Sequence, residues 1–157
     1  SLAKTIPVPA GATVELLKKP KVLSPTDYLQ MEADAASTLH ATVTVEKTTT
    51  ALHFGSGLDL TTGAAYTNLY IANANSVIES VLLSNDDGVF DVKAKVAWTN
   101  GADVIQGYYC YELIIPADST IELLDQPKFL ESGYKVQVYS NVGGRLEAMI
   151  AGKTIGS

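Results

Sequence analysis

The sequence predicts an all-β fold, an antiparallel β-sandwich of the jelly-roll or immunoglobulin-like type. Short alternating segments rich in valine, isoleucine, threonine and tyrosine recur between turn residues, while helical periodicity is scarce. A second observation is an internal repeat, in which the chain carries half of the same unit twice. With 157 residues, 46% of them hydrophobic, the chain has enough apolar side chains to build a core.

The clearest strands lie in the second half of the chain. Residues 89–98, VFDVKAKVAW, alternate apolar and polar side chains, so Val92, Ala94 and Val96 are expected on one face. Further strands are expected over 77–83, 108–115 and 134–140. Turn residues separate them, in the stretches NDDG (85–88), TNG (99–101), PAD (116–118) and VGG (142–144).

The first half also contains alternating segments. YLQMEAD (28–34) places Leu29 and Met31 on one face, and TLHATVTVEK (38–47) does the same with its apolar residues. Both are expected to be half-buried strands. Residues 25–37 have the most helix-like composition of the chain, but a strand is preferred because the matching part of the repeat reads as one.

The repeat joins these two halves. PAGATVELLKKPKVL begins at Pro9 and PADSTIELLDQPKFL begins at Pro116, so a shift of 107 positions (116 minus 9) aligns them. About a dozen identities follow along this one ungapped alignment. We therefore expect residues 9–46 and 116–153 to superpose strand for strand.

Three parts follow from the repeat. Residues 68–157 are expected to form a complete sandwich, because the second copy is preceded by its own strands. Residues 1–47 resemble the rear half of a sandwich whose front is missing, and residues 48–67 are expected to be a linker or arm with one strand in it. A lone half-sandwich is unstable in water, so its partner should be either the main domain of this chain or a neighbouring subunit. We expect it to complete a sandwich in an oligomer by strand addition or exchange.

Charge and hydropathy exclude several partners. A net charge of −6 repels phosphate backbones, and no cluster of basic residues offsets it, so nucleic acid is not an expected partner. No apolar run approaches the length of a membrane span, and the N-terminal residues show no hydrophobic signal region. We expect no membrane association.

The residues with reactive side chains do not form a recognisable active or metal site. Cys110 is expected to be a small packed side chain, and His40 and His53 are expected to be surface residues. NDDGVFD (85–91) has the oxygen ligands that calcium prefers, but its spacing fits a hairpin turn better. No nucleophile elbow or phosphate loop is present, so we predict no catalytic residue, no metal and no cofactor, and a protein that is not an enzyme.

The motifs around the repeat resemble those of small β-rich virion proteins of tailed bacteriophages. The resemblance rests on VPAGATVELLKKPKVL and IPADSTIELLDQPKFLESGYKVQVYS, and it covers residues 5–46 and 62–155. Gly133 matches the family's turn, whereas Tyr134 replaces the aspartate that follows it, and Thr26 stands where the first copy would have the glycine. The resemblance implies a virion component, located in the virion after assembly in the host cytoplasm.

These observations lead to a prediction of function. We expect an oligomeric capsid decoration or cement protein, such as a trimer, that binds itself and the major capsid protein or other virion proteins. The alternative is a neck, tail or fibre module that binds host-surface carbohydrate. A glycan-cleaving enzyme would need a carboxylate pair, and none is indicated. The candidate interface residues are Val14, Leu16, Leu29, Met31, Tyr109, Tyr111, Tyr134 and Tyr139.

Overall fold

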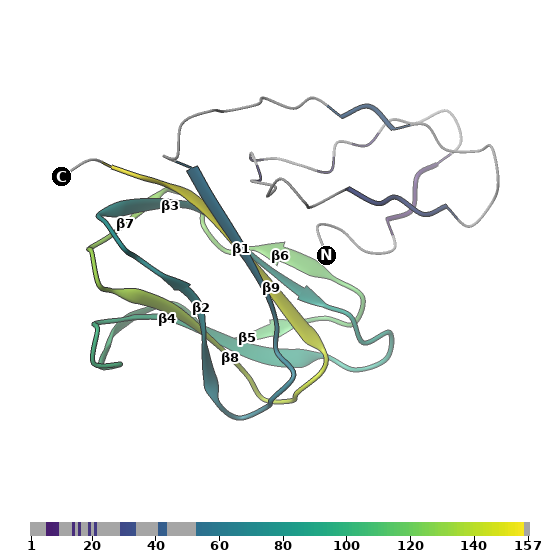
Figure 1. Ribbon diagram of the computed structural model, residues 1–157. Helices are drawn as coiled ribbons and strands as arrows, with labels where there is room; N and C mark the ends of the chain where they lie inside the picture. Colours follow the sequence, from purple (N-terminus) through teal and green to yellow (C-terminus); the bar gives the residue numbers. More distant parts are fainter. Residues whose placement is uncertain are drawn as a thin grey trace.

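The computed structural model describes residues 6–9, 14, 16, 19, 21, 29–33, 41–43 and 53–155. Within these residues the chain forms nine β-strands and no helix (Figure 1). The expected all-β class is confirmed. Across the same residues, no helix is long and apolar enough to span a membrane.

The strands form two antiparallel sheets. One sheet has the order β1-β9-β3-β6, with β7 also pairing with β3, and the other has the order β2-β8-β4-β5. The strands are β1 (His53–Asp59), β2 (Tyr66–Ile71), β3 (Ser76–Asn85), β4 (Val92–Thr99), β5 (Ile105–Ile115), β6 (Thr120–Glu122), β7 (Lys128–Leu130), β8 (Lys135–Ser140) and β9 (Leu146–Thr154).

The strand order defines a jelly roll. Strands β6 and β7 pair with the two ends of β3 and act as one interrupted strand. If β6 and β7 are counted as the sixth strand, β8 becomes the seventh and β9 the eighth. The strand order is then 1-8-3-6 in one sheet and 2-7-4-5 in the other, which is the order produced by folding a long hairpin into two packed sheets. The topology therefore decides between the two sandwich types that the sequence left open.

The core lies between the sheets and follows the expected alternation. Val92, Ala94 and Val96 of β4 are buried there, as are Val136 and Val138 of β8. Their neighbours along each strand point to the opposite face of the sheet. Strands predicted over 77–83, 89–98 and 134–140 thus correspond to β3, β4 and β8.

The sandwich begins earlier than residue 68. Strand β1, which lies in the segment expected to be a linker or arm with one strand in it, pairs with β9 along its whole length. Its small residues suggest a linker, yet an edge strand needs little side-chain burial because the backbone ladder holds it. Phe54 of β1 also stacks on Tyr70 of β2, with ring centroids 4.0 Å apart, and so joins the two sheets at this edge.

The first repeat copy differs from expectation where it is described. Residues 29–33 and 41–43 lie in no strand and are exposed, although their repeat partners 136–140 and 148–150 lie in β8 and β9. The predicted half-buried strands are therefore absent at these positions. A physical reason is that extended segments need neighbouring strands, which this half of the repeat does not supply. The rest of the copy, and with it most of the expected superposition, falls outside the described residues.

Candidate binding face

The outer face of the sheet β2-β8-β4-β5 carries the most distinctive side chains of the sandwich. Because residues of β4 and β8 alternate between the core and the outside, Lys95 and Tyr139 face outward. The register places Tyr66 of β2 beside Tyr139, and Tyr139 beside Lys95. One row across the sheet thus contains two tyrosines and a lysine.

Two more tyrosines of β5 complete an aromatic cluster around Lys95. The rings of Tyr108 and Tyr111 meet edge to face with centroids 5.0 Å apart, and those of Tyr66 and Tyr139 lie 5.5 Å apart. The Lys95 Nζ is 4.4 Å from the centroid of Tyr111 and 5.1 Å from that of Tyr139. Cation–π contacts of this kind hold the rings in place. We call Tyr66, Tyr108, Tyr111 and Tyr139 the tyrosine cluster.

Irregularities in β5 explain why Tyr108 and Tyr111 share a face although they are three residues apart. The pairing of β4 with β5 shifts on both sides of Val96, so β5 contains extra residues there. As a result, Tyr109 and Cys110 both pack against the core, between the two outward-facing tyrosines. Tyr109 stacks on Trp98 with ring centroids 5.3 Å apart.

A polar group lies in the next row of the same face. The amide nitrogen of Gln137 donates to the Oδ1 atoms of Asn68 and Asp103, each at 2.8 Å. Asn68 comes from the edge strand β2, and Asp103 comes from the β4–β5 loop, where its backbone adopts a left-handed conformation with φ of 62°. These bonds fix Gln137, which is only 7% exposed. We call Asn68, Asp103 and Gln137 the polar trio.

The tyrosine cluster and the polar trio border one hollow. This open hollow of about 540 Å³ is lined by the polar trio together with Tyr66, Thr67 and Ile105. Partial burial and the approach of Tyr108 raise the pKa of Tyr66 above its ordinary value. The hollow therefore offers hydroxyl, amide and carboxylate groups beside the aromatic ring of Tyr66.

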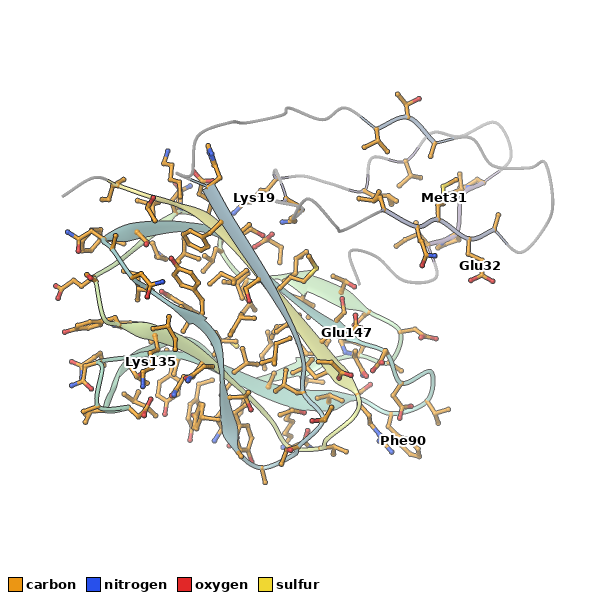
Figure 2. All side chains as sticks on the ribbon, viewed as in Figure 1. Lys19, Met31, Glu32, Phe90, Lys135 and Glu147 are labelled. Atoms are coloured by element: carbon orange, nitrogen blue, oxygen red, sulfur yellow. The ribbon has the colours of Figure 1, made fainter. Side chains whose placement is uncertain are left out.

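Two lysines on this face form ion pairs. Lys135 Nζ lies 2.8 Å from Asp103 Oδ1, and Lys95 Nζ lies 3.5 Å from Glu112 Oε1. Lys135 is at the start of β8, at the end of the face where the β4–β5 loop folds back (Figure 2). Lys95 and Lys135 are thus each paired with an acid, and Lys93 of β4 is a further lysine, exposed on the same face.

The expected interface residues do not form one surface. Tyr111 and Tyr139 lie in the tyrosine cluster, whereas Tyr109 and Tyr134 are half-buried and pack against the core. Sequence reasoning missed Tyr66, because it was assigned to the end of the linker. The aromatic and β-branched residues of YTNLYI (66–71) were the available signal for a strand there.

The other four expected interface residues belong to the first repeat copy and are exposed. They are Val14, Leu16, Leu29 and Met31. Met31 is 55% exposed, and Figure 2 shows Met31 and Glu32 well away from the sandwich. Whether these residues contact a partner stays a prediction.

Two lysines of the first copy nevertheless contact the sandwich. Lys21 Nζ lies 2.8 Å from Glu122 Oε2 and also donates to Ser80 Oγ, and the Lys21 side chain is buried. Lys19 Nζ donates to the carbonyl oxygen of Leu124. Both contacts fall beside β6, the short strand at the edge of its sheet. This contact, centred on Lys21 and Glu122, is the anchor of the first copy.

Asp87, one of the residues considered for calcium binding, has structural partners, whereas His40 lies outside the described residues. Asp87 accepts hydrogen bonds from the backbone nitrogens of Val89 and Phe90, and its Oδ2 lies 2.8 Å from Arg145 Nε. The two backbone bonds, followed by Arg145, lower the pKa of Asp87. Among the described residues, no group of three or more His, Cys, Asp or Glu side chains could hold a metal ion. Burial raises the pKa of Cys110, which disfavours a reactive thiolate.

Comparisons with known proteins give distant structural likenesses. No protein-family model and no curated protein matches the chain. Two crystal structures of a pentameric capsid protein isolated from metagenomic phage sequences are similar in structure. The first is 14% identical, with a TM-score of 0.37, over 71% of this chain and 71% of that one. The second is 17% identical, with a TM-score of 0.34, over 68% of this chain and 64% of that one.

Proposed function

We propose that this chain is a structural protein of a tailed-bacteriophage particle, an oligomeric decoration or cement subunit that acts through protein–protein surfaces. One observation carries the proposal: the apolar side chains of the first repeat copy that the structure describes are exposed, although Lys21 of this copy contacts the sandwich. These side chains include Val14, Leu16, Leu29, Met31 and Val43. Groups of exposed apolar residues mark sites where another protein binds.

The anchor supports the same proposal. A lysine buried against Glu122 and Ser80 holds one point of the first copy at β6, the last strand of its sheet among the described residues. An edge strand offers free backbone donors and acceptors to an incoming strand. Segments on either side of the anchor can then bury their apolar residues against a neighbouring copy.

The proposed location in a phage capsid rests on the resemblance of the repeat motifs to those of virion proteins. Jelly rolls occur in both viral capsid and lectin domains, and fold alone does not define function. The motifs of the repeat, which resemble those of phage virion proteins, favour the capsid role. In this proposal the chain binds itself and the major capsid protein or other virion proteins, it has no catalytic role, and its place is the virion.

The copy number of the chain in purified particles tests the proposal. Quantitative mass spectrometry should find hundreds of copies, and electron microscopy should place them over the head. A handful of copies at one vertex or along the tail would contradict decoration and favour the neck, tail or fibre alternative. Absence of the chain from particles would contradict every virion role.

A further inference from the structure

We propose that the outer face of the sheet β2-β8-β4-β5 is a binding site for a neutral oligosaccharide, formed by the tyrosine cluster and the polar trio. The inference is independent of the proposed function, because it uses only side chains of the sandwich and applies to a subunit at any position in a particle. It concerns a different surface from the first repeat copy and its anchor.

The first argument is the combination of groups. A sugar ring has one or two apolar faces of C–H bonds and an edge of hydroxyls that both donate and accept hydrogen bonds. Tyrosine rings supply rigid amphipathic surface for the first, and amide and carboxylate groups supply directed partners for the second. Here Tyr66 belongs to both sets, since it is part of the cluster and lines the hollow beside Asn68 and Gln137.

The second argument is that the groups are already held in place. Gln137 is fixed by its bonds to Asn68 and Asp103, and Asp103 is fixed further by Lys135. The rings of Tyr111 and Tyr139 rest against Lys95. A site whose polar groups are fixed before binding loses less conformational freedom when the ligand arrives.

The third argument is charge, which separates a neutral glycan from an anionic ligand. Lys95 contacts the tyrosine cluster and Lys135 contacts the polar trio, and each of these two cations has a carboxylate partner within 3.5 Å. A uronate, sialate or phosphate would have to displace Glu112 or Asp103 from its lysine. A neutral sugar leaves both ion pairs intact.

The size of the hollow fits this ligand class. Its volume of about 540 Å³ lies inside the range of about 300–1,000 Å³ that is typical of small-molecule sites. Tyr66 lines the hollow and its hydroxyl contacts Tyr108, so further sugar units would extend from the hollow toward Tyr108. The geometry suits an internal or terminal segment of a chain more than an isolated monosaccharide.

The test uses the full chain and an array of defined oligosaccharides, with neutral and acidic sequences on the same slide. We expect binding to at least one neutral probe and weaker binding to acidic probes. The strongest neutral probe is then titrated by calorimetry against Tyr111→Ala and Asn68→Ala. Both residues are exposed, so both variants should fold, and each should weaken binding by about tenfold or more.

Phe129→Ala is the matched control. Phe129 is 56% exposed and Tyr111 is 59% exposed, but Phe129 lies on β7 in the other sheet. Its replacement should change the affinity less than about twofold. Failure of every neutral probe to bind, a preference for acidic probes, unchanged affinity in Tyr111→Ala and Asn68→Ala, or an equal loss in Phe129→Ala would each overturn the proposal. So would a loss of self-association in Tyr111→Ala without any glycan signal, which would make the face a protein interface.

Discussion

At the scale of single residues, Gly107 leaves room for the indole ring of Trp98. It pairs with Trp98 across β4 and β5, and a Cβ placed on it would lie 2.2 Å from Cη2 of the indole ring. Because that ring is held by Tyr109, it has little room to move. We expect Gly107→Ala to lower the free energy of unfolding by about 1–3 kcal/mol in urea denaturation.

Gly101→Ala is the control for this prediction. A Cβ at Gly101 would meet the carbonyl oxygen of Gly133 at 3.5 Å, an ordinary contact distance, and the φ of Gly101 is not positive. Its effect should stay within about 0.5 kcal/mol. Equal stability of the two variants would contradict the role given to the contact between Gly107 and Trp98.

Thr99 is a second residue with a specific consequence. Its hydroxyl is buried without a hydrogen-bond partner in the described part of the chain. Replacing such a group with a methyl removes the free energy lost by burying an unpaired hydroxyl. We expect Thr99→Val to raise the thermal midpoint and to increase the free energy of unfolding by about 1 kcal/mol. Thr120→Val should do the reverse, because the Thr120 hydroxyl lies 2.7 Å from Ser84 Oγ.

At the scale of elements, Glu122 connects three segments. Its Oε1 accepts from the backbone nitrogen of Val81 at 2.9 Å, where the pairing of β3 with β9 shifts between Ile78 and Ser80. Its Oε2 accepts from Ser80 and Lys21. The carboxylate thus binds the Val81 nitrogen between the parts of β3 that pair with β6 and β7, while the Val81 carbonyl oxygen accepts from the backbone nitrogen of Leu123.

The protonation of Glu122 should make stability depend on pH. Burial alone raises the pKa of this carboxyl, but hydrogen bonds from Lys21, Ser80 and Val81 together lower it below its ordinary value. A lowered pKa means that the contribution to stability is present above the ordinary glutamate pKa of about 4.3 and is lost as the pH falls through the folded value. We expect Glu122→Gln to reduce the loss of stability between about pH 5 and pH 3, measured by urea denaturation.

Lys21→Met separates the anchor from the rest of this network. It should raise the pKa of Glu122, followed by NMR titration of the carboxyl carbon, because the cation that favours the carboxylate is removed. An unchanged pKa in Lys21→Met would mean that the first copy does not contact the sandwich in solution.

The elements also show what sequence can predict. The strands β4 and β8 were predictable because apolar and polar residues alternate along them, and β3 was predictable from its apolar β-branched run between turn residues. Strand β1 was not predicted as part of the sandwich because it contains glycines and a serine. Its pairing with β9 depends on backbone hydrogen bonds, which do not require a particular pattern of side chains. The tyrosine cluster could not be predicted from alternation, because the irregular pairing of β5 places Tyr108 and Tyr111 on one face and turns Tyr109 toward the core.

At the scale of the whole molecule, the question is what the first repeat copy contributes. Strands β1 to β9 form both sheets of the sandwich, and its core is made by residues outside that copy. A chain that starts at Ala51 keeps β1, whereas a start at Thr61 would remove it and expose β9 as an edge. We therefore expect the chain from Ala51 to fold, with a cooperative thermal transition.

The same truncation should change assembly. It removes the exposed Val14, Leu16, Leu29 and Met31 and also the lysine of the anchor, so the surfaces proposed to join one copy to the next are lost. In sedimentation velocity experiments at matched concentration, the full chain should form an oligomer and the truncated chain should remain a monomer. Leu29→Ser together with Met31→Ser in the full chain should weaken the oligomer without altering the sandwich, because both side chains lie outside its core. If the truncated chain assembles as well as the full one, the repeat copy is an appendage and the contacts between subunits must come from the sandwich itself.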